Sequence, residues 1–378
     1  MRNMRAVLIF APLYLAACSD APVPVVYQHD QCHRLKLLDA ANGTSIRGAE
    51  DIASLPGGDL LISAYDRRMK DDDGKPPEGG VYFLSKRDLD RDEATVTPIL
   101  TPREGGLRPH GIAVHPVDKE TARIAVVNRA WVSSGDGKPS EEPEILTFTF
   151  RLPEREAGPV FALSDDRFCR ANDLAFRDED TLEMTIDRNA CSGFASFYEN
   201  VLRQEKGRIL TLDLSDNAAN VVGTLDNTLA FPNGIGTKSL SWEGTEEDQY
   251  VAVAETRGNR IRFYPFADDP EGRWDPVTLP GSPDNITVGK PGLILAALHP
   301  NLVTLALYRY DWPFFETAPS RIVKITGTQV LTLFDDPSGE VFSAASVAVQ
   351  TFGKLVIGSV GDEGLLVCGV NRRTTQSS

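Results

Sequence analysis

The sequence predicts an all-β protein with the fold of a six-bladed β-propeller. A unit made of a polar or small pair, a short apolar strand, a turn and a second apolar strand recurs at intervals of about 60 residues, with one shorter interval of roughly 50. Each interval has room for about four strands and their loops, which is one propeller blade. No sustained helical periodicity competes with this pattern.

Six segments of the chain carry the repeat. The first reads "EDIASLPGGDLLISAYD" from Glu50, and the fifth reads "DNITVGKPGLILAALHP" from Asp284. The other four begin at His110, Asn172, Asn233 and Ala345. Short strands and turns would also alternate in a β-sandwich or in two unrelated β domains, so these folds are the alternatives. The best candidate for a short helix is "FASFYENVLRQEK", residues 194–206.

Four of the five cysteines can form disulfides if the chain is exported. Cys32 opens the mature domain and Cys368 nearly closes it, so a bridge between them would join the two ends of the fold. Cys169 and Cys191 would then be left for a local bridge. Free buried thiols are the alternative, because sequence spacing does not supply the geometry of a disulfide.

The first residues predict export. Two arginines precede an apolar run that is too short to span a bilayer and ends in small residues, so residues 1–17 are expected to be a signal peptide. The segment "LAAC" resembles the lipoprotein box of bacteria, which implies lipidation of Cys18, with a plain secretory signal as the alternative. By the same resemblance, Ser19 favours anchoring at the outer membrane of the bacterial cell envelope. The expected organisation is a signal peptide at 1–17, a tether at 18–31, a propeller at 32–370 and a tail at 371–378.

The charge of the chain restricts its partners. A net charge of −15 repels polyanions, and no basic tract is present that could follow a phosphate backbone. Nucleic acid is therefore not an expected partner. The lipid anchor would supply the only membrane contact, and a small molecule is the expected ligand.

Acidic and amide residues introduce the repeated strands. In a propeller the innermost strand of each blade lines the central channel, so residues at the start of these strands gather at one end of it. The residues expected to converge are Glu50, Asp51, Asn172, Asp173, Asn233, Asp284 and Asn285. So many oxygen atoms would repel one another or stay unsatisfied unless a cation were bound between them.

Calcium fits this set of residues. It takes about six to eight oxygen ligands with flexible geometry, including amide oxygens. Zinc is disfavoured because no group of cysteine and histidine residues has the spacing of a zinc site. Any one of the polar pairs is also a common turn dipeptide, so the prediction of a calcium-binding tunnel depends on their recurrence at one place in the repeat.

Several phrases together resemble the paraoxonase/arylesterase family. They are "GAEDIASLPGG", "RPHGIAV", "IAVVN", "ANDLAF", "FPNGIG", "SPDNITV", "LHPN" and "GKLVIGSV", and their order and spacing match the family from Cys32 to Cys368. The broader relatives of this family are gluconolactonase-like and strictosidine-synthase-like propellers. The resemblance implies hydrolysis of a lactone or an aryl ester.

The resemblance also implies two calcium ions in the tunnel. The ion exposed to substrate would be bound by Glu50, Asn172, Asn233, Asp284 and Asn285. A deeper, structural ion would be bound by Asp51, Asp173 and the backbone carbonyl of Ile112. His110 matches the catalytic histidine of the family, and His299 matches a histidine at the wall of the active site.

One position departs from the family. Vertebrate paraoxonases carry the second histidine of a proposed catalytic dyad where this chain has Arg129. Arginine cannot accept a proton at working pH, so it cannot act as a base. Arg129 is expected to pair with Asp187 or to bind an anionic group of the substrate.

Two classes of function follow from these observations. In the first, the chain is a calcium-dependent hydrolase in which His110 deprotonates the attacking water, with Asp284 or Glu50 as the alternative base. In the second, it is a lipid-anchored propeller without catalytic activity, in which calcium only stabilises the tunnel and the upper face binds a partner or small ligand. Arg129 is the feature that keeps the second class open.

Overall fold

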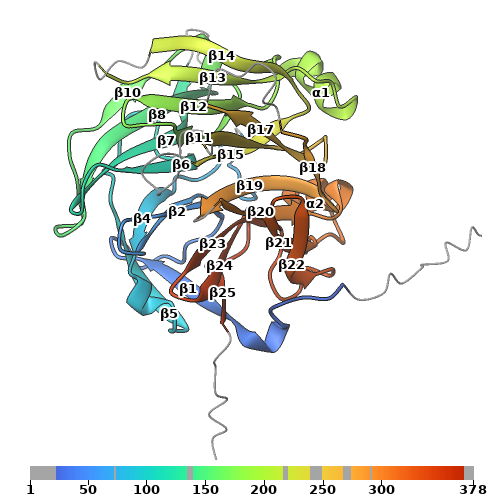
Figure 1. Ribbon diagram of the computed structural model, residues 1–378. Helices are drawn as coiled ribbons and strands as arrows, with labels where there is room; N and C mark the ends of the chain where they lie inside the picture. Colours follow the sequence, from blue (N-terminus) through green and yellow to red (C-terminus); the bar gives the residue numbers. More distant parts are fainter. Residues whose placement is uncertain are drawn as a thin grey trace, which may run out of the picture.

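Strands dominate the computed structural model of the chain, which describes residues 23–71, 74–133, 139–215, 220–238, 249–266, 274–289 and 292–369. Within these ranges the strands form one eight-stranded, one five-stranded and three four-stranded sheets, which Figure 1 shows arranged around a common centre. The prediction of an all-β, propeller-like protein is confirmed. The predicted signal peptide, the lipidation site Cys18 and the tail at 371–378 lie outside the described residues.

The eight-stranded sheet joins the two ends of the chain. Its strands, in spatial order, are β2 (Ala49–Ser54), β3 (Leu60–Ala64), β4 (Gly80–Leu84), β5 (Glu93–Pro98), β1 (Cys32–Asp39), β25 (Leu365–Gly369), β24 (Lys354–Ser359) and β23 (Ala345–Thr351). The five-stranded sheet follows β5 along the chain. It contains β6 (Pro109–Pro116), β7 (Thr121–Ser133), β8 (Pro139–Arg151) and β10 (Phe161–Leu163), with the short β9 (Glu156–Ala157) paired to β8.

The three remaining sheets have four antiparallel strands each, in sequence order. The first contains β11 (Ala171–Phe176), β12 (Thr181–Ile186), β13 (Gly207–Asp213) and β14 (Asn220–Leu229). The second contains β15 (Pro232–Lys238), β16 (Tyr250–Glu255), β17 (Arg260–Pro265) and β18 (Val277–Thr278). The third contains β19 (Ser282–Gly289), β20 (Leu293–His299), β21 (Ser320–Thr326) and β22 (Gln329–Asp336).

The repeated strands that the sequence predicted form a closed ring. β2, β6, β11, β15, β19 and β23 each pack beside the next, and β23 packs beside β2. The sheets stack face to face around this ring, so their inner strands are covered on both sides. The second strand β16 reads "YVAVAE" and every one of its side chains is buried, whereas β5, which lies between β4 and β1 farther from the ring, alternates exposed and buried residues.

Strand β1 closes the fold. Its first half pairs antiparallel with β25, and its second half pairs parallel with β5, so the N-terminal strand bridges the two halves of the eight-stranded sheet. Cys32 stands opposite Cys368 in this ladder, and the two form a disulfide, as predicted. Tyr27, placed in the predicted tether, is buried and donates its backbone N–H to Leu333 O of β22 at 2.8 Å.

A second disulfide joins Cys169 to Cys191. This is the local bridge that the sequence left open against free thiols. Two disulfides indicate that the chain folds in an oxidising, exported environment. Among the described helices, none is long and apolar enough to cross a membrane.

Two helices extend from the ends of second strands. The predicted helix is confirmed as α1 (Gly193–Val201), although it ends before residue 206. A further helix, α2 (Leu302–Arg309), was not predicted; Asn301 caps it by accepting hydrogen bonds from Val303 N and Thr304 N. Three short 3₁₀ segments, η1 (His29–Gln31), η2 (Lys86–Asp88) and η3 (Asp166–Phe168), complete the elements.

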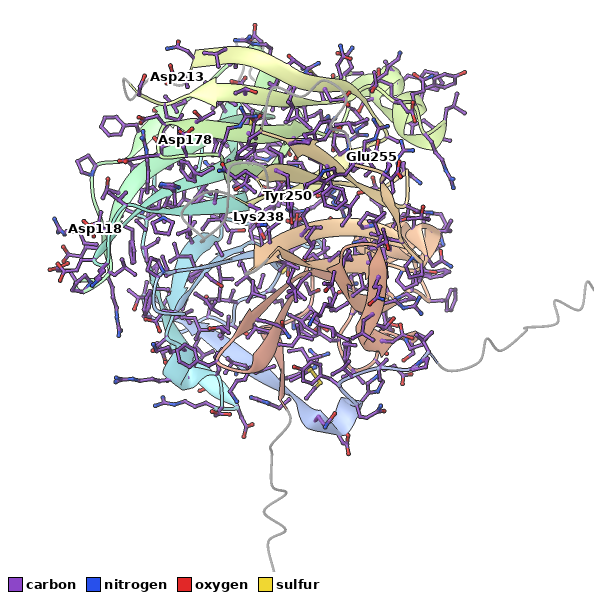
Figure 2. All side chains as sticks on the ribbon, in the orientation of Figure 1. Asp118, Asp178, Asp213, Lys238, Tyr250 and Glu255 are labelled. Carbon is purple, nitrogen blue, oxygen red and sulfur yellow. A yellow bond between two sulfur atoms is a disulfide. The ribbon has the colours of Figure 1, made fainter. Side chains whose placement is uncertain are left out.

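The starts of the inner strands lie on the same side as the two helices. Pro232 at the start of β15 pairs with Glu255 at the end of β16, and Figures 1 and 2 show Glu255, α1 and α2 on one side. Asp118 and Asp178, in the turns after β6 and β11, and Asp213, at the end of β13, lie on the opposite side (Figure 2). The polar pairs at the strand starts are therefore presented toward the face that carries the helices.

Candidate active site

The polar pairs coincide with β-bulges in the ring of inner strands. In all six strands the pairing with the neighbouring strand shifts register at the pair. The shifts fall between Ala49 and Asp51, Pro109 and Ile112, Ala171 and Leu174, Pro232 and Ile235, Pro283 and Ile286, and Ala345 and Val347. A bulge interrupts the strict alternation of a strand and re-aims its side chains, which explains why two consecutive polar residues can both be buried at the axis.

Two of these bulges need a glycine because neighbouring strands approach closely. A Cβ on Gly111 would lie 2.5 Å from Asp173 Oδ1, and a Cβ on Gly234 would lie 2.5 Å from Ile286 N. The Cβ on Gly111 would also lie 2.6 Å from Asp173 Cα, so both glycines face a backbone atom that cannot easily move away. The "HG" and "NG" dipeptides of the repeat are therefore set by close packing at the axis as well as by turn chemistry.

The five residues predicted to bind the upper ion are all buried at this bulge level. We call them the upper ring: Glu50, Asn172, Asn233, Asp284 and Asn285. Asn285 Nδ2 donates to Glu50 O at 3.0 Å, and Asn233 Nδ2 donates to Asp284 Oδ1. These contacts bring β2, β15 and β19 together, and Asn172 occupies the same bulge position in β11.

Oxygen atoms of the upper ring lack hydrogen-bond partners. The Oδ1 atoms of Asn172, Asn233 and Asn285 are buried and accept no hydrogen bond, and Glu50 Oε2 has only charge contacts. An unsatisfied buried polar atom costs roughly 1–3 kcal/mol. Two carboxylates and three amide oxygens form the hard, all-oxygen donor set that Ca²⁺ prefers, so the residues present fit the predicted ion.

Amide oxygens are essential to any such site. In the part of the chain that the structure describes, no three His, Cys, Asp or Glu side chains come close enough together to hold a metal ion by themselves. A site on the axis must therefore combine the carboxylates with asparagine oxygens.

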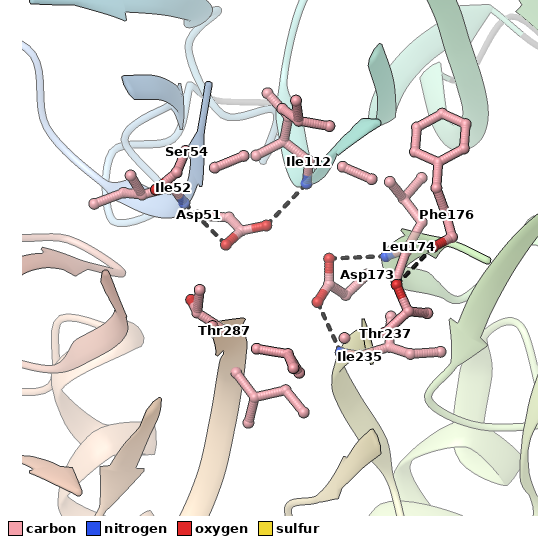
Figure 3. Close-up of a pocket in the computed structure, with 18 of the residues that line it drawn as sticks. Asp51, Ile52, Ser54, Ile112, Asp173, Leu174, Phe176, Ile235, Thr237 and Thr287 are labelled. Atoms are coloured by element: carbon pink, nitrogen blue, oxygen red, sulfur yellow. Dashed lines mark hydrogen bonds between the residues drawn. The ribbon is translucent and has the colours of Figure 1, made fainter. Parts of the chain in front are cut away.

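The two carboxylates predicted to bind the deeper ion face each other below the upper ring. We call Asp51 and Asp173 the lower pair. Asp51 accepts hydrogen bonds from Ile52 N at 2.9 Å and Ile112 N at 2.8 Å. Asp173 accepts from Leu174 N at 2.8 Å and from Ile235 N at 2.9 Å. Figure 3 shows both carboxylates pointing into a cavity of about 290 Å³ in the axis.

Burial dominates the electrostatics of the lower pair. It raises the pKa of Asp51 to about 7, with a further contribution from the negative charge of Asp284. Burial also raises the pKa of Asp173 well above its ordinary value, and the charge of Asp51 adds to this effect. Two carboxyls so close together in a buried cavity favour either a shared proton or a cation.

His110 lies in the bulge of β6 and is buried. Its Nδ1 lies 3.2 Å from Glu50 Oε2, a charge contact that is not aligned as a hydrogen bond, and its backbone carbonyl accepts from the Ser63 hydroxyl. Burial, followed by the positive charges of Arg67, Arg129 and Arg309, lowers the pKa of His110 well below its ordinary value. The imidazole is therefore neutral at pH 7.

The three predicted substrate-binding residues have defined partners. His299 Nε2 lies 2.8 Å from Asp284 Oδ2, so this histidine contacts a residue of the upper ring. Arg129 does not pair with Asp187. The structure instead places Arg129 Nη1 2.7 Å from Glu141 Oε1, because β7 and β8 form a long hairpin that carries both residues.

Asp187 has a different ion-pair partner. Its Oδ1 lies 3.1 Å from Nε of the adjacent Arg188, and its negative charge is among the interactions that raise the pKa of Arg129. Arg129 and Asp187 are thus electrostatically coupled without a direct ion pair.

A further charged residue, Arg67, reaches this site and was missed by the sequence analysis. Its guanidinium forms an ion pair with Glu50 Oε2 and lies 4.9 Å from the centre of the Tyr65 ring. Burial, then the positive charges of Arg309 and Arg129, lowers its pKa well below the ordinary value. In the sequence, Arg67 begins the charged run "RRMKDDDG" after the second repeated strand, which is typical of a solvated loop.

Comparison with known proteins decides the family. A family model described as Arylesterase matches residues 31–369. The chain belongs to the arylesterase family. The family match spans almost the whole described chain and confirms the resemblance found in the sequence. Membership of the arylesterase family supports a hydrolase that acts on esters or lactones. No curated relative matches the chain.

Several solved structures are similar to this arylesterase-family chain at low identity. A gluconolactonase from Xanthomonas campestris is 15% identical, with 92% of this chain and 98% of that chain covered and a TM-score of 0.46. A putative gluconolactonase is 15% identical, with 71% and 92% covered and a TM-score of 0.39. A functionally unknown protein from Desulfotomaculum acetoxidans is 10% identical, with 86% and 90% covered and a TM-score of 0.40.

Proposed function

We propose that this arylesterase-family chain is a calcium-dependent hydrolase of lactones or aryl esters, with two calcium ions on the axis of a six-bladed propeller. The observation that carries the proposal is the set of buried oxygen atoms in the upper ring that have no hydrogen-bond partner. A fold that buries such atoms in one place needs a ligand for them.

The eight-stranded sheet counts as two blades in this proposal. β2 to β5 form one run of four, and β23, β24, β25 and β1 form another; the two runs meet where β1 pairs with β5. With the other four sheets, the ring of six inner strands then gives six blades. The disulfide between Cys32 and Cys368 reinforces the closing blade.

The proposed ligands divide between two levels of the axis. Glu50, Asn172, Asn233, Asp284 and Asn285 would hold the upper ion, and Asp51, Asp173 and the carbonyl of Ile112 would hold the lower one. The upper ion, when bound, would polarise the carbonyl of the substrate and stabilise the negative charge that develops on its oxygen.

His110 is the proposed general base. It is neutral at pH 7, and the carboxylate of Glu50 beside its Nδ1 favours the tautomer in which that nitrogen carries the proton. Nε2 is then left to accept a proton from the attacking water. Such help contributes typically 10²- to 10⁴-fold to a rate.

The two alternative bases are less available. Asp284 uses Oδ1 to accept from Asn233 and contacts His299 through Oδ2. Glu50 contacts Arg67 and His110 through Oε2. Unlike Asp284 and Glu50, His110 has no proposed role as a calcium ligand. Its Nε2 can therefore serve as the base.

The chain's setting and remaining residues complete the proposal. Arg129, Asp187 and His299 would line the substrate site, and the partner is a small ester or lactone. Export through the signal peptide and lipidation at Cys18 would anchor the propeller in the bacterial cell envelope, where disulfides persist.

The test is hydrolysis of phenyl acetate and of aliphatic lactones by the metal-replete protein, before and after treatment with a calcium chelator. We expect the rate to fall at least about 100-fold on chelation and to return with added Ca²⁺, because the carbonyl loses several kcal/mol of electrostatic activation. Elemental analysis should find calcium in the active protein. Chelator-insensitive background hydrolysis would overturn the proposal and leave the non-catalytic binding module.

A further inference from the structure

Three arginines from distant segments interact electrostatically beside the upper ring. Arg67 follows β3, Arg129 lies in β7 and Arg309 ends α2. Arg68 Nη2 lies 2.5 Å from Asp311 Oδ1, and its guanidinium lies 4.2 Å from the centre of the Tyr308 ring. These contacts hold the segment after β3 against the end of α2. We call Arg67, Arg129 and Arg309 the arginine cluster.

Electrostatic interactions couple the members of the arginine cluster. The charges of Arg309 and Arg129 lower the pKa of Arg67, after the larger effect of burial. The same three arginines lower the pKa of His110, again after burial. Arg67 and Arg129 are buried beside the proposed reaction site, with side chains 9% and 12% exposed, whereas Arg309 is exposed.

The cluster has more donors than the protein supplies with acceptors. The Arg67 side chain is 9% exposed; its Nη2 forms the ion pair with Glu50, and its buried Nε makes no hydrogen bond. Arg129 pairs with Glu141 through Nη1, but its buried Nε also makes no hydrogen bond. A buried guanidinium without acceptors is strongly destabilising, so these donors point to a ligand that is an acceptor.

The shortage of acceptors for Arg67 becomes greater if calcium is bound as in the proposed function, and the inference rests on that proposed function. If Glu50 contributes its charge to a bound cation, Arg67 loses the carboxylate with which it is paired while it remains buried. The missing acceptor must then come from the substrate. A planar guanidinium with parallel N–H donors matches a carboxylate in geometry and charge.

We propose that the arginine cluster binds a carboxylate carried by the substrate, so that the preferred substrates are esters or lactones with a second, ionised carboxyl group. Arg67 contacts this carboxylate directly, and Arg129 and Arg309 supply additional positive charge. The chain as a whole is strongly acidic, with a net charge of −15, so the cluster is a local reversal of the surrounding field.

The first test compares two esters of equal chain length. Mono(4-nitrophenyl) glutarate carries a carboxylate, and 4-nitrophenyl valerate does not. We expect Arg67→Met to lower the ratio of kcat/KM for the glutarate ester to kcat/KM for the valerate ester about 10- to 100-fold, as for the loss of hydrogen bonds to a charged group; effects through Glu50 and His110 act on both esters and cancel in this ratio. Arg67→Lys, which keeps the charge without the planar fork, should recover part of the loss.

Two further variants control the first test. Arg309→Met alters an exposed side chain and should reduce the preference for the glutarate ester severalfold without affecting folding. Arg151→Met removes an arginine that pairs with Glu154 and Glu156 away from the axis, and should leave both esters unchanged. If Arg67→Met does not fold, Arg309→Met carries the comparison.

The second test measures binding without turnover. Titration calorimetry of the calcium-replete protein with glutarate, and with the neutral glutaramide, should show binding of the dianion alone and at least tenfold weaker binding to Arg67→Met. Equal losses for both esters in Arg67→Met, or no binding of glutarate to the unmodified protein, would overturn the inference and make Arg67 a structural partner of Glu50. If neither ester is hydrolysed but glutarate binds through Arg67, the proposed function fails and the arginine cluster stands.

Discussion

The upper ring and the lower pair occupy the same bulges but differ in hydrogen bonding. Every carboxylate oxygen of the lower pair accepts a backbone N–H, and in each case one donor comes from the neighbouring inner strand. Asp51 thereby links β2 to β6, and Asp173 links β11 to β15. One residue earlier, Asn172 has a buried oxygen that accepts no hydrogen bond, and Glu50 Oε2 has charge contacts with Arg67 and His110 in place of backbone N–H donors.

This difference separates two uses of one repeated motif. A carboxylate that receives two backbone hydrogen bonds stabilises the contact between strands whether or not a ligand is bound. An oxygen without a donor does not stabilise the fold until something binds to it. Substitutions at the two levels should therefore affect different properties of the protein.

The largest expected effect concerns the residue beside the upper ring. We expect His110→Gln to lower kcat/KM for ester hydrolysis by about 10²- to 10⁴-fold, because the amide has no basic nitrogen to accept the proton of water. Calcium content and the unfolding temperature should change little. His115→Gln is the matched control, since His115 lies beside the lower cavity, away from the proposed reaction. An unchanged rate in His110→Gln would transfer the role of base to Asp284 or Glu50.

The second prediction sets one level directly against the other. Asp173→Ala leaves the N–H groups of Leu174 and Ile235 buried without their acceptor, so we expect the free energy of unfolding to fall by about 2–4 kcal/mol. Asn285→Ala removes a proposed ligand and one hydrogen bond to Glu50 O, so stability should fall by about 1 kcal/mol.

Activity should follow the opposite order. Under conditions where both variants are folded, Asn285→Ala should lose about 100-fold in kcat/KM and retain less than one calcium ion at the upper level. Denaturant unfolding and ester hydrolysis should be measured on the same preparations. They show which of the two variants loses more stability and which loses more activity. A large loss of stability in Asn285→Ala with a proportionate loss of rate would assign a structural role to both levels.

The sequence predicted the axis of this fold better than its surroundings. Recurrence of polar pairs at one place in the repeat identified the bulge positions, because close strand packing and burial restrict those residues in all six units. Cys32 and Cys368 could be paired because they mark the two ends of the mature domain. The polar pairs recur at a regular interval, and the two cysteines lie at the ends of the domain. Neither signal depends on the path of the loops.

Contacts made by loops and long hairpins could not be predicted in this way. The partner of Arg129 is Glu141, which depends on how far the hairpin of β7 and β8 extends beyond the axis. Arg67 was hidden in a charged run that resembles a solvated loop, although its side chain turns inward to Glu50. For α2, the residue Asn301 before "LVTLALYR" is a capping signal that could have been found.

The smallest expected effect concerns a buried carboxyl that lies away from the axis. It serves as a reference for the upper ring and the lower pair. Glu183 in β12 is fully buried, forms an ion pair with Arg177 at 2.6 Å and accepts from the Thr211 hydroxyl at 2.9 Å. Burial raises its pKa from 4.5 to about 7. The folded state therefore binds the proton more tightly than the unfolded state, and the stability gained from this group is lost as the pH rises from about 4.5 through 7.

Between pH 5.5 and 7 this loss amounts to roughly 1.5 kcal/mol. Glu183→Gln should remove that part of the pH dependence, measured by denaturant unfolding at the two pH values, whereas Glu156→Gln at an exposed ion pair should not. Because Glu183 is outside both levels of the axis, the slope should be the same with and without added Ca²⁺. A calcium-dependent slope at Glu183 would show that ion binding reorganises the sheet beyond the axis, and the upper ring could then no longer be treated separately from the strands that support it.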